Sequence, residues 1–138
     1  MGKVVRAVAD TSILIALVKV SEPSPDLSGL GDICVSALSW SELSIRLHTV
    51  SDVAGMSRRL EEFSALRALF TLTLPYDDRC AVAYQRILAR VLEQGGAPKA
   101  RPFDRMIAAT ALAHEVPLIT RDRAGFGQVG NLVDVIER

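Results

Sequence analysis

The 138-residue chain has few aromatic residues, few cysteines and no net charge. Aromatic side chains make up 5% of it, too few for the stacking platforms with which single-strand-binding proteins hold nucleic acid. No apolar run reaches the ~18 residues that suggest a membrane span. A formal net charge of zero gives no overall attraction to nucleic acid. We therefore expect no membrane association, and a function that depends on local clusters of residues.

The low cysteine content is informative about compartment. Cys34 and Cys80 are too few, and too far apart in the sequence, to form a zinc site by themselves. We expect two buried, reduced thiols, which are typical of a cytoplasmic protein. The length is that of one domain, so we predict a single domain over 1–138.

Strand and helix patterns alternate along the chain. We predict strands over 3–9, 33–36, 71–74, 117–120 and 132–136. We predict helices over 13–18, 39–49, 53–70 and 103–114, and a further long helix capped by Asp77 or Asp78. The helix over 53–70 has an apolar stripe of Met56, Leu60, Phe63, Leu66 and Phe70. This alternation favours an α/β fold with a mostly parallel sheet covered on both faces.

Four carboxylates lie where a predicted strand ends or a helix begins: Asp10, Glu42, Asp104 and Asp122. In a parallel α/β sheet these places converge on the edge formed by the carboxyl ends of the strands, where ligands bind. Clustered acids repel one another unless protons or a cation neutralise them. Mg²⁺ prefers oxygen ligands and is usually held by a few carboxylates. The pattern therefore predicts a Mg²⁺ or Mn²⁺ site and phosphodiester chemistry.

Each acid taken singly also has a structural interpretation. Asp10 is well placed to cap a helix. Ser39-x-x-Glu42 has the spacing of a capping box, in which the Glu side chain bonds back to the Ser backbone. Asp104 would complement a helix dipole, and Asp122 lies in a turn after a strand. These alternatives stay open at the level of single residues.

Basic residues surround two of the four acids. Five of them flank Asp104 and Asp122: Lys99, Arg101, Arg105, Arg121 and Arg123. Such a patch is able to contact phosphates, although ordinary solvated surface explains it equally well.

Four segments together resemble a known family. They are AVADTSILIAL (7–17), SWSELSIRL (39–47), RPFDRMIAATALA (101–113) and PLITRDRAGF (117–126). In this order and spacing the set resembles a PIN-domain ribonuclease of the VapC-like toxin type, over nearly the whole chain. The resemblance implies a doubly wound, three-layer α/β/α fold with a mostly parallel five-stranded sheet, usually as a homodimer. It also implies Mg²⁺- or Mn²⁺-dependent cleavage of structured RNA, and a cognate antitoxin of a type II toxin–antitoxin system.

The same resemblance assigns roles by position. Four residues become the catalytic, metal-binding acids: Asp10, Glu42, Asp104 and Asp122. Ser12 and Thr120 become supporting hydroxyls. We hypothesise that four arginines hold the RNA backbone: Arg101, Arg105, Arg121 and Arg123. The chain departs from the family at Gly125, before Phe126, where many relatives have a further Asp or His; if a second metal ion needs that residue, this chain holds only one ion firmly.

Other functions fit the residues less well. Residues 125–130 have the spelling G-x-G-x-x-G, but a dinucleotide site needs a helix directly after it and an acid about 20 residues on. We therefore expect no nucleotide cofactor. A phosphatase with Asp10 as nucleophile would by resemblance need a second Asp at the place of Ser12. A degenerate PIN fold that binds RNA or a partner without cutting remains the alternative.

Overall fold

The computed structural model describes residues 6–129 and 131–138. Five strands form one sheet in the order β3-β2-β1-β4-β5, and every neighbouring pair is parallel. They are β1 (Arg6–Ala9), β2 (Asp32–Ser36), β3 (Thr73–Leu74), β4 (Leu118–Thr120) and β5 (Val135–Glu137). The order reverses between β1 and β4, which makes the sheet doubly wound and places a topological switch point there. The predicted α/β fold is confirmed.

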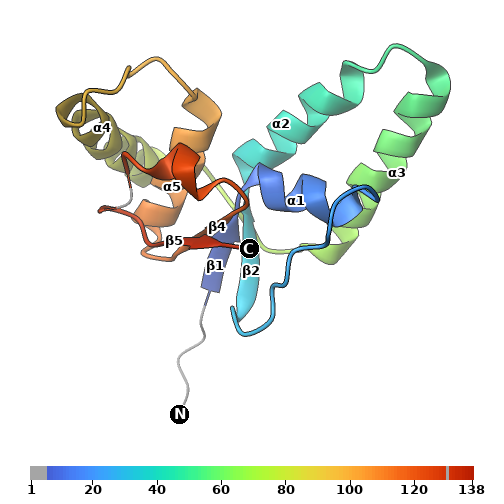
Figure 1. The fold of residues 1–138 in the computed structure, drawn as a ribbon, viewed down its shortest axis with the longest axis horizontal. Coiled ribbons are helices and arrows are strands. Elements are labelled where there is room, and N and C mark those ends of the chain that lie inside the picture. Colours follow the sequence, from blue (N-terminus) through green and yellow to red (C-terminus); the bar gives the residue numbers. More distant parts are fainter. Residues whose placement is uncertain (1–5, 130) are drawn as a thin grey trace.

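Within the described residues, five helices and one short 3₁₀ helix connect the strands (Figure 1). They are α1 (Thr11–Val18), α2 (Ala37–His48), α3 (Val53–Leu69), α4 (Asp78–Glu93), α5 (Pro102–Ala113) and η1 (Arg123–Phe126). An Asp side chain caps α1, α3 and α4, and Asp77 is the cap of α4. Pro102 occupies the first turn of α5, where its missing N–H costs nothing.

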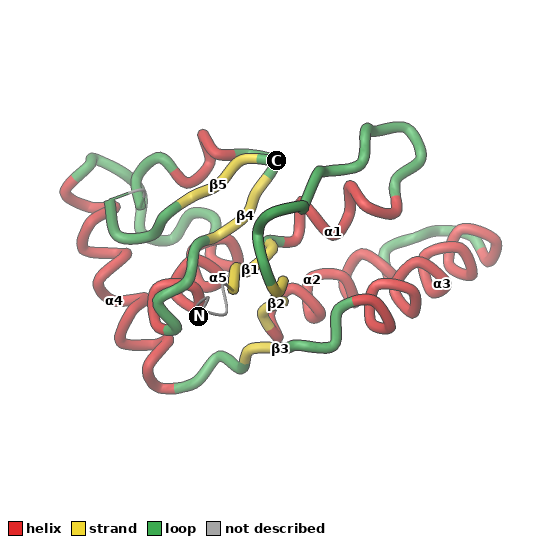
Figure 2. Tube along the Cα trace, turned by 90° about the horizontal axis from the view of Figure 1, so that it is seen from below, coloured by secondary structure: helices red, strands yellow, loops and turns green. Residues whose placement is uncertain are grey.

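The helices form two layers because alternate residues of each strand point to opposite faces. Ala7 and Ala9 of β1 pack with the apolar residues of α1, α2 and α3. Val8, between them, packs with α4 and α5. In Figures 1 and 2 the strands run between the α4–α5 group and the α1–α3 group. The carboxyl ends of the strands therefore lie between two helical layers.

Several predicted boundaries shift in the structure. The last strand, predicted over 132–136, is Val135–Glu137, and β3 has only two residues. Residues 3–5 of the first predicted strand lie outside the described residues. Strand β5 begins where Val135 pairs with Leu118 of β4, so the position of the neighbouring strand sets its start.

The apolar stripe predicted on 53–70 is only partly buried. Leu66 and Phe70 are in the core, whereas Met56 is 39% exposed and Leu60 52% exposed. Figure 1 gives the reason, because the α2–α3 hairpin extends beyond the sheet and the first half of α3 has only α2 beside it. The helical spacing therefore predicted the helix correctly, but it did not predict which apolar side chains of the helix are buried.

Both cysteines are buried and free, as predicted. Cys34 of β2 packs against the α4–α5 layer. Across the part of the chain that the structure describes, no helix combines the length and the apolar composition needed to cross a membrane.

Candidate active site

Asp10 is the most enclosed of the four predicted acids. It follows β1 at the switch point, caps α1 and is 3% exposed. Its Oδ1 accepts hydrogen bonds from Ser12 Oγ (2.5 Å) and from the Ile13 N–H (3.3 Å), and its Oδ2 accepts one from Thr120 Oγ1 (2.7 Å). Burial raises the pKa of Asp10 against these hydrogen bonds, and the charge of Asp104 raises it further. Capping and site formation thus use the same carboxylate.

The two predicted hydroxyls connect Asp10 to the end of β4. Thr120 is fully buried, and its Oγ1 also accepts a hydrogen bond from the Asp122 N–H (3.0 Å). Ser12 Oγ accepts one from the Arg121 N–H (3.1 Å). The two hydroxyl oxygens are 3.4 Å apart. Together they fix the orientation of the Asp10 carboxylate across the β1–β4 junction.

Glu42 is not part of a capping box, so that interpretation is wrong. Helix α2 begins at Ala37, and its cap is Ser36, whose Oγ accepts a hydrogen bond from the Leu38 N–H (3.2 Å). The chain turns into the helix directly where β2 ends, which places Ser39 inside the helix. Glu42 Oε1 instead accepts a 2.6 Å hydrogen bond from Thr11 Oγ1.

Thr11 is a site residue that the sequence reasoning missed. Its hydroxyl lies 3.1 Å from Ser39 Oγ as well as close to Glu42, so it joins the start of α1 to α2. The available indication was its position directly after Asp10, in the first turn of a helix at a strand end. Its partners lie about thirty positions away, so only the tertiary structure identifies what it contacts.

Three of the four acids lie close enough for their charges to interact. Burial raises the pKa of Glu42, and the charges of Asp104 and Asp10 raise it further. Asp104 also raises the pKa of Asp10. These side chains belong to the end of β1, to α2 and to α5. Their mutual repulsion gives the site an affinity for protons or for a cation.

The fourth acid, Asp122, is linked to Asp104 by an arginine. Arg101 donates from Nε and Nη2 to Oδ2 of Asp104, at 2.9 Å each, and from Nη2 to Oδ2 of Asp122 at 3.1 Å. Asp122 Oδ1 caps η1 by accepting a hydrogen bond from the Gly125 N–H (3.1 Å). Its hydrogen bond from Arg101 lowers the pKa of Asp122.

Arg101 adopts an unusual backbone conformation. Its φ of 53° and ψ of 51° are left-handed, a region that costs a non-glycine residue about 1 kcal/mol or more. It precedes α5 without a side-chain cap. The same residue makes two ion pairs at the site through its partly exposed guanidinium.

A family model described as PIN domain matches residues 7–132. The chain belongs to the PIN domain family. It is similar to Ribonuclease VapC of Rickettsia bellii, 26% identical over 125 residues and 91% of each chain. It is also similar to Ribonuclease VapC1 of Rickettsia felis, 28% identical over the same share of each chain.

Solved structures agree with this PIN-domain assignment. One is VapBC-5 from Mycobacterium tuberculosis, a member of the VapBC family of toxin-antitoxin systems, with a TM-score of 0.74 at 26% identity over 96% of this chain and 98% of that one. FitAcB from Neisseria gonorrhoeae shares the fold, with a TM-score of 0.77 at 23% identity over 94% and 96%. The predicted family, a PIN domain of the VapC-like type, is confirmed.

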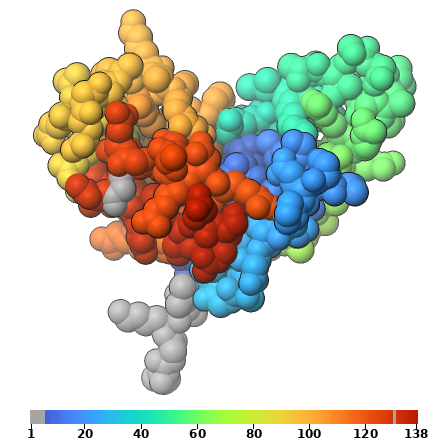
Figure 3. Space-filling view, in the orientation of Figure 1, coloured from blue at the N-terminus to red at the C-terminus, as the bar shows by residue number. Residues whose placement is uncertain are grey.

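The site of this PIN domain lies beneath a notch on the surface. Figure 3 shows the notch between the yellow and orange residues of α4 and α5 and the green residues of α2 and α3. In Figure 1 the carboxyl ends of β1 and β2 point toward it. Asp10 and the start of α2 follow these two strands directly.

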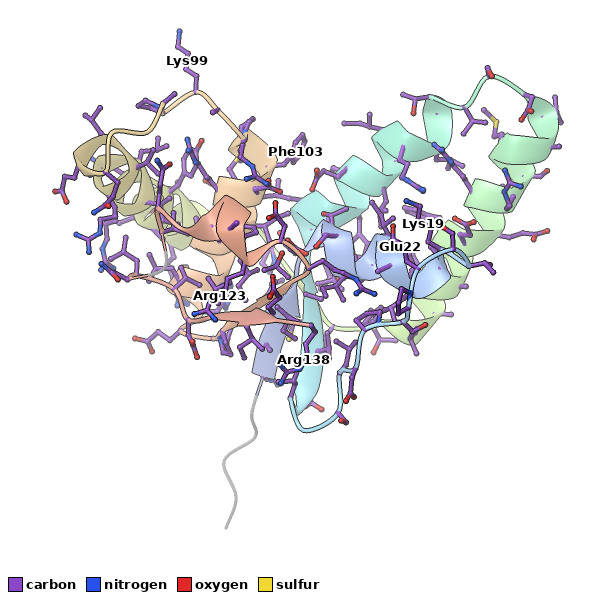
Figure 4. All side chains as sticks on the ribbon, viewed as in Figure 1. Lys19, Glu22, Lys99, Phe103, Arg123 and Arg138 are labelled. Carbon is purple, nitrogen blue, oxygen red and sulfur yellow. The ribbon has the colours of Figure 1, made fainter. Side chains whose placement is uncertain are left out.

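The other predicted arginines are placed differently from Arg101. Arg105 is buried and donates to the carbonyl of Ala97 (2.5 Å) and to Gln128 Oε1 (3.2 Å), so it holds two loops together. Arg121 donates from Nη2 to the carbonyl of Pro23. Arg123 is exposed on η1. Figure 4 also shows Lys99 at the tip of the loop before α5, pointing away from the body of the domain.

The chemistry of the acids fits a hard divalent cation, although the site is not closed around one. Within residues 6–129 and 131–138, no three Asp, Glu, His or Cys side chains lie close enough together to hold an ion as they stand. Two of the four acids, Asp104 and Asp122, are ion-paired with Arg101. Arg101 bonds Oδ2 of Asp104 and Thr11 bonds Oε1 of Glu42, so these contacts leave Oδ1 of Asp104 and Oε2 of Glu42 available as oxygen ligands.

Proposed function

We propose that this PIN domain is a Mg²⁺- or Mn²⁺-dependent endoribonuclease that cleaves structured RNA as the toxin of a type II toxin–antitoxin system. The observation that carries the proposal is that the end of β1, α2 and α5 bring Asp10, Glu42 and Asp104 to the carboxyl edge of the sheet, where the charge of Asp104 raises the pKa of the other two. Two of these acids have raised pKa values because of burial and mutual repulsion, which a divalent cation would relieve. The similarity to proteins named Ribonuclease VapC supports the same activity.

Asp10, Glu42 and Asp104 would hold the ion. When bound, a divalent ion polarises a phosphoryl oxygen, activates the attacking water and shields the leaving oxygen. Thr120 and Ser12 keep both oxygens of Asp10 in a fixed orientation, and Thr11 does the same for Glu42. Asp122 is the fourth acid that we propose for catalysis, and it acts from its ion pair with Arg101.

The RNA backbone would lie across the notch. Arg101, Arg121 and Arg123 are the arginines of the predicted set that we propose as phosphate contacts. Arg105 is left out because it is buried and already bonded to two internal oxygens. A homodimer remains a proposal from the family. A cognate antitoxin is the proposed protein partner, supported by the likeness to a member of the VapBC family of toxin-antitoxin systems.

The test compares RNA cleavage by the purified, antitoxin-free protein and by Glu42→Gln, with Mg²⁺ or Mn²⁺ and with EDTA. Gln keeps a carbonyl oxygen to accept the Thr11 hydrogen bond, so the variant removes charge and leaves that contact possible. We expect the parent to cut only with metal, and the folded variant to lose roughly a hundredfold or more, the size of a general-base contribution. Equal cleavage by the two proteins would refute the assignment of Glu42.

One observation favours the second candidate, a PIN fold that binds without cutting. Arg101 already neutralises part of the charge of Asp104 and Asp122. Binding of Mn²⁺ by the parent without cleavage of any RNA in a total pool would favour this candidate.

A further inference from the structure

We propose that the Arg101 guanidinium takes the place of a second divalent ion, so that this PIN domain binds one ion, at Asp10, Glu42 and Asp104. The inference rests on the proposed metal site and assigns Arg101 as its positioning residue. It also changes the role expected for Asp122. This acid is predicted to bind metal, and here its counter-ion is instead the Arg101 side chain.

The guanidinium joins two acids that come from different elements. Asp104 belongs to the first turn of α5, and Asp122 lies after β4. Arg101 reaches Oδ2 of each, at 2.9 Å and 3.1 Å. A cation shared by two carboxylates is the arrangement that a bridging metal would otherwise provide, and arginine keeps its charge at every physiological pH. Asp104 is thus shared, with Oδ2 toward Arg101 and its charge also acting on Asp10 and Glu42.

Gly125 makes the room that Arg101 occupies. A Cβ built on Gly125 would lie 2.5 Å from Nη2 of Arg101 and 2.6 Å from Oδ2 of Asp122, and closer still to Nη1. Contacts this short are not found for real Cβ atoms. Any side chain at position 125 would therefore force the guanidinium to shift. The absence of a side chain at Gly125 and the position of the Arg101 guanidinium therefore depend on each other.

Two ion pairs hold the guanidinium there. Pro102, which begins α5, favours an extended backbone for the residue before it, so the left-handed conformation of Arg101 goes against a local preference. The Arg101 side chain is 42% exposed, and its ion pairs with Asp104 and Asp122 keep it at the site. A second divalent ion would have to expel this fixed positive charge or bind beside it against Coulomb repulsion.

The experiment is a Mn²⁺ titration of the purified full-length, antitoxin-free protein, followed by calorimetry and by electron paramagnetic resonance of free Mn²⁺. The parent should bind one Mn²⁺. Arg101→Gln should bind two, with the first roughly tenfold tighter because a nearby like charge is removed. Arg58→Gln removes an equal charge from the exposed face of α3 and should match the parent.

Gly125→Ala is the second variant, and it keeps the test decisive if Arg101→Gln does not fold. It should also bind two Mn²⁺, because the added methyl group forces the guanidinium to shift from its place beside Asp122 without adding a metal ligand. Thermal unfolding establishes that each variant is folded. Two ions in the parent, or one ion at unchanged affinity in both folded variants, would overturn the inference and leave the metal-dependent nuclease standing. No Mn²⁺ binding by the parent would overturn both.

Discussion

Asp10 combines a local function with a tertiary one. Its Oδ1 caps α1, a function for which Asp and Asn are preferred residues. Its Oδ2 accepts from Thr120, more than a hundred positions away. The local function was readable from the sequence, and the tertiary one was predicted only through the family resemblance.

Ionised Asp10 should destabilise the metal-free protein. Its pKa is raised in the folded state, so its contribution to stability is complete below the ordinary value and is lost as pH rises through the raised pKa. Asp10→Asn keeps the cap and removes this titration. We expect the metal-free variant to melt a few degrees above the parent at pH 7, with the difference shrinking as pH falls toward 4. Thermal unfolding across that pH range measures it, and a constant difference would contradict the prediction.

The Thr11 hydroxyl should stabilise the Glu42 carboxylate in its position at the site. Thr11→Val keeps the shape and removes the donor of the 2.6 Å hydrogen bond, which leaves a half-buried carboxylate without that partner. The cost is about 1–3 kcal/mol, shared between stability and activity. Thr11→Ser restores the hydroxyl and should recover both. Urea unfolding and RNA cleavage of the three proteins provide the measurement, and equal values for Val and Ser would show that the hydroxyl is unused.

At the scale of elements, the start of α2 shows which of two serines, Ser36 or Ser39, caps the helix. The Ser39-x-x-Glu42 spacing fits a capping box, yet Ser36 is the cap. The backbone leaves β2 at Ser36, and the helix begins with the next residue. Strand length, which sheet pairing sets, therefore decided where the helix starts.

Removing the Ser36 hydroxyl should weaken α2. Ser36→Ala should lower the free energy of unfolding by about 1 kcal/mol, the usual cost of losing an N-cap. Ser41→Ala, on the exposed side of the same helix, is the control and should be nearly neutral. Urea unfolding compares them, and a neutral Ser36→Ala would place the start of the helix elsewhere.

The two halves of α3 should respond differently to truncation. Leu66 is 3% exposed and Leu60 is 52% exposed on the same helix. Leu66→Ala should cost about 2–5 kcal/mol of stability, the range for a buried leucine, whereas Leu60→Ala should cost far less. Chemical denaturation of both variants tests this. Similar losses would mean that another surface covers the first half of α3 in solution.

For the whole molecule, a divalent ion should act as a structural ligand as well as a cofactor. Mn²⁺ at about 100 times its dissociation constant should add about 2.7 kcal/mol to the free energy of unfolding. Asp10→Asn should lose most of this gain. Thermal unfolding with Mn²⁺ and with EDTA gives the comparison, and an equal gain in both proteins would place the ion outside the acid cluster.

The sequence by itself determined the class of fold, the family and the approximate positions of most elements. Those features depend on local patterns, which residues close together in the sequence form. The patterns are the strand–helix alternation, the helix caps and the four family segments. Asp77 as a cap and Pro102 at the start of α5 were predictable for the same reason.

Only the tertiary structure decided how the site is connected. The Thr11–Glu42 bond, the cap at Ser36 and the position of Arg101 between Asp104 and Asp122 all depend on where separate strands end in space. Gly125 shows the difference most clearly. In the sequence, Gly125 stands where the family resemblance would place an acid. In the structure, its lack of a side chain leaves room for the Arg101 guanidinium. Such packing joins residues that are far apart in the sequence, so no local sequence pattern predicts it.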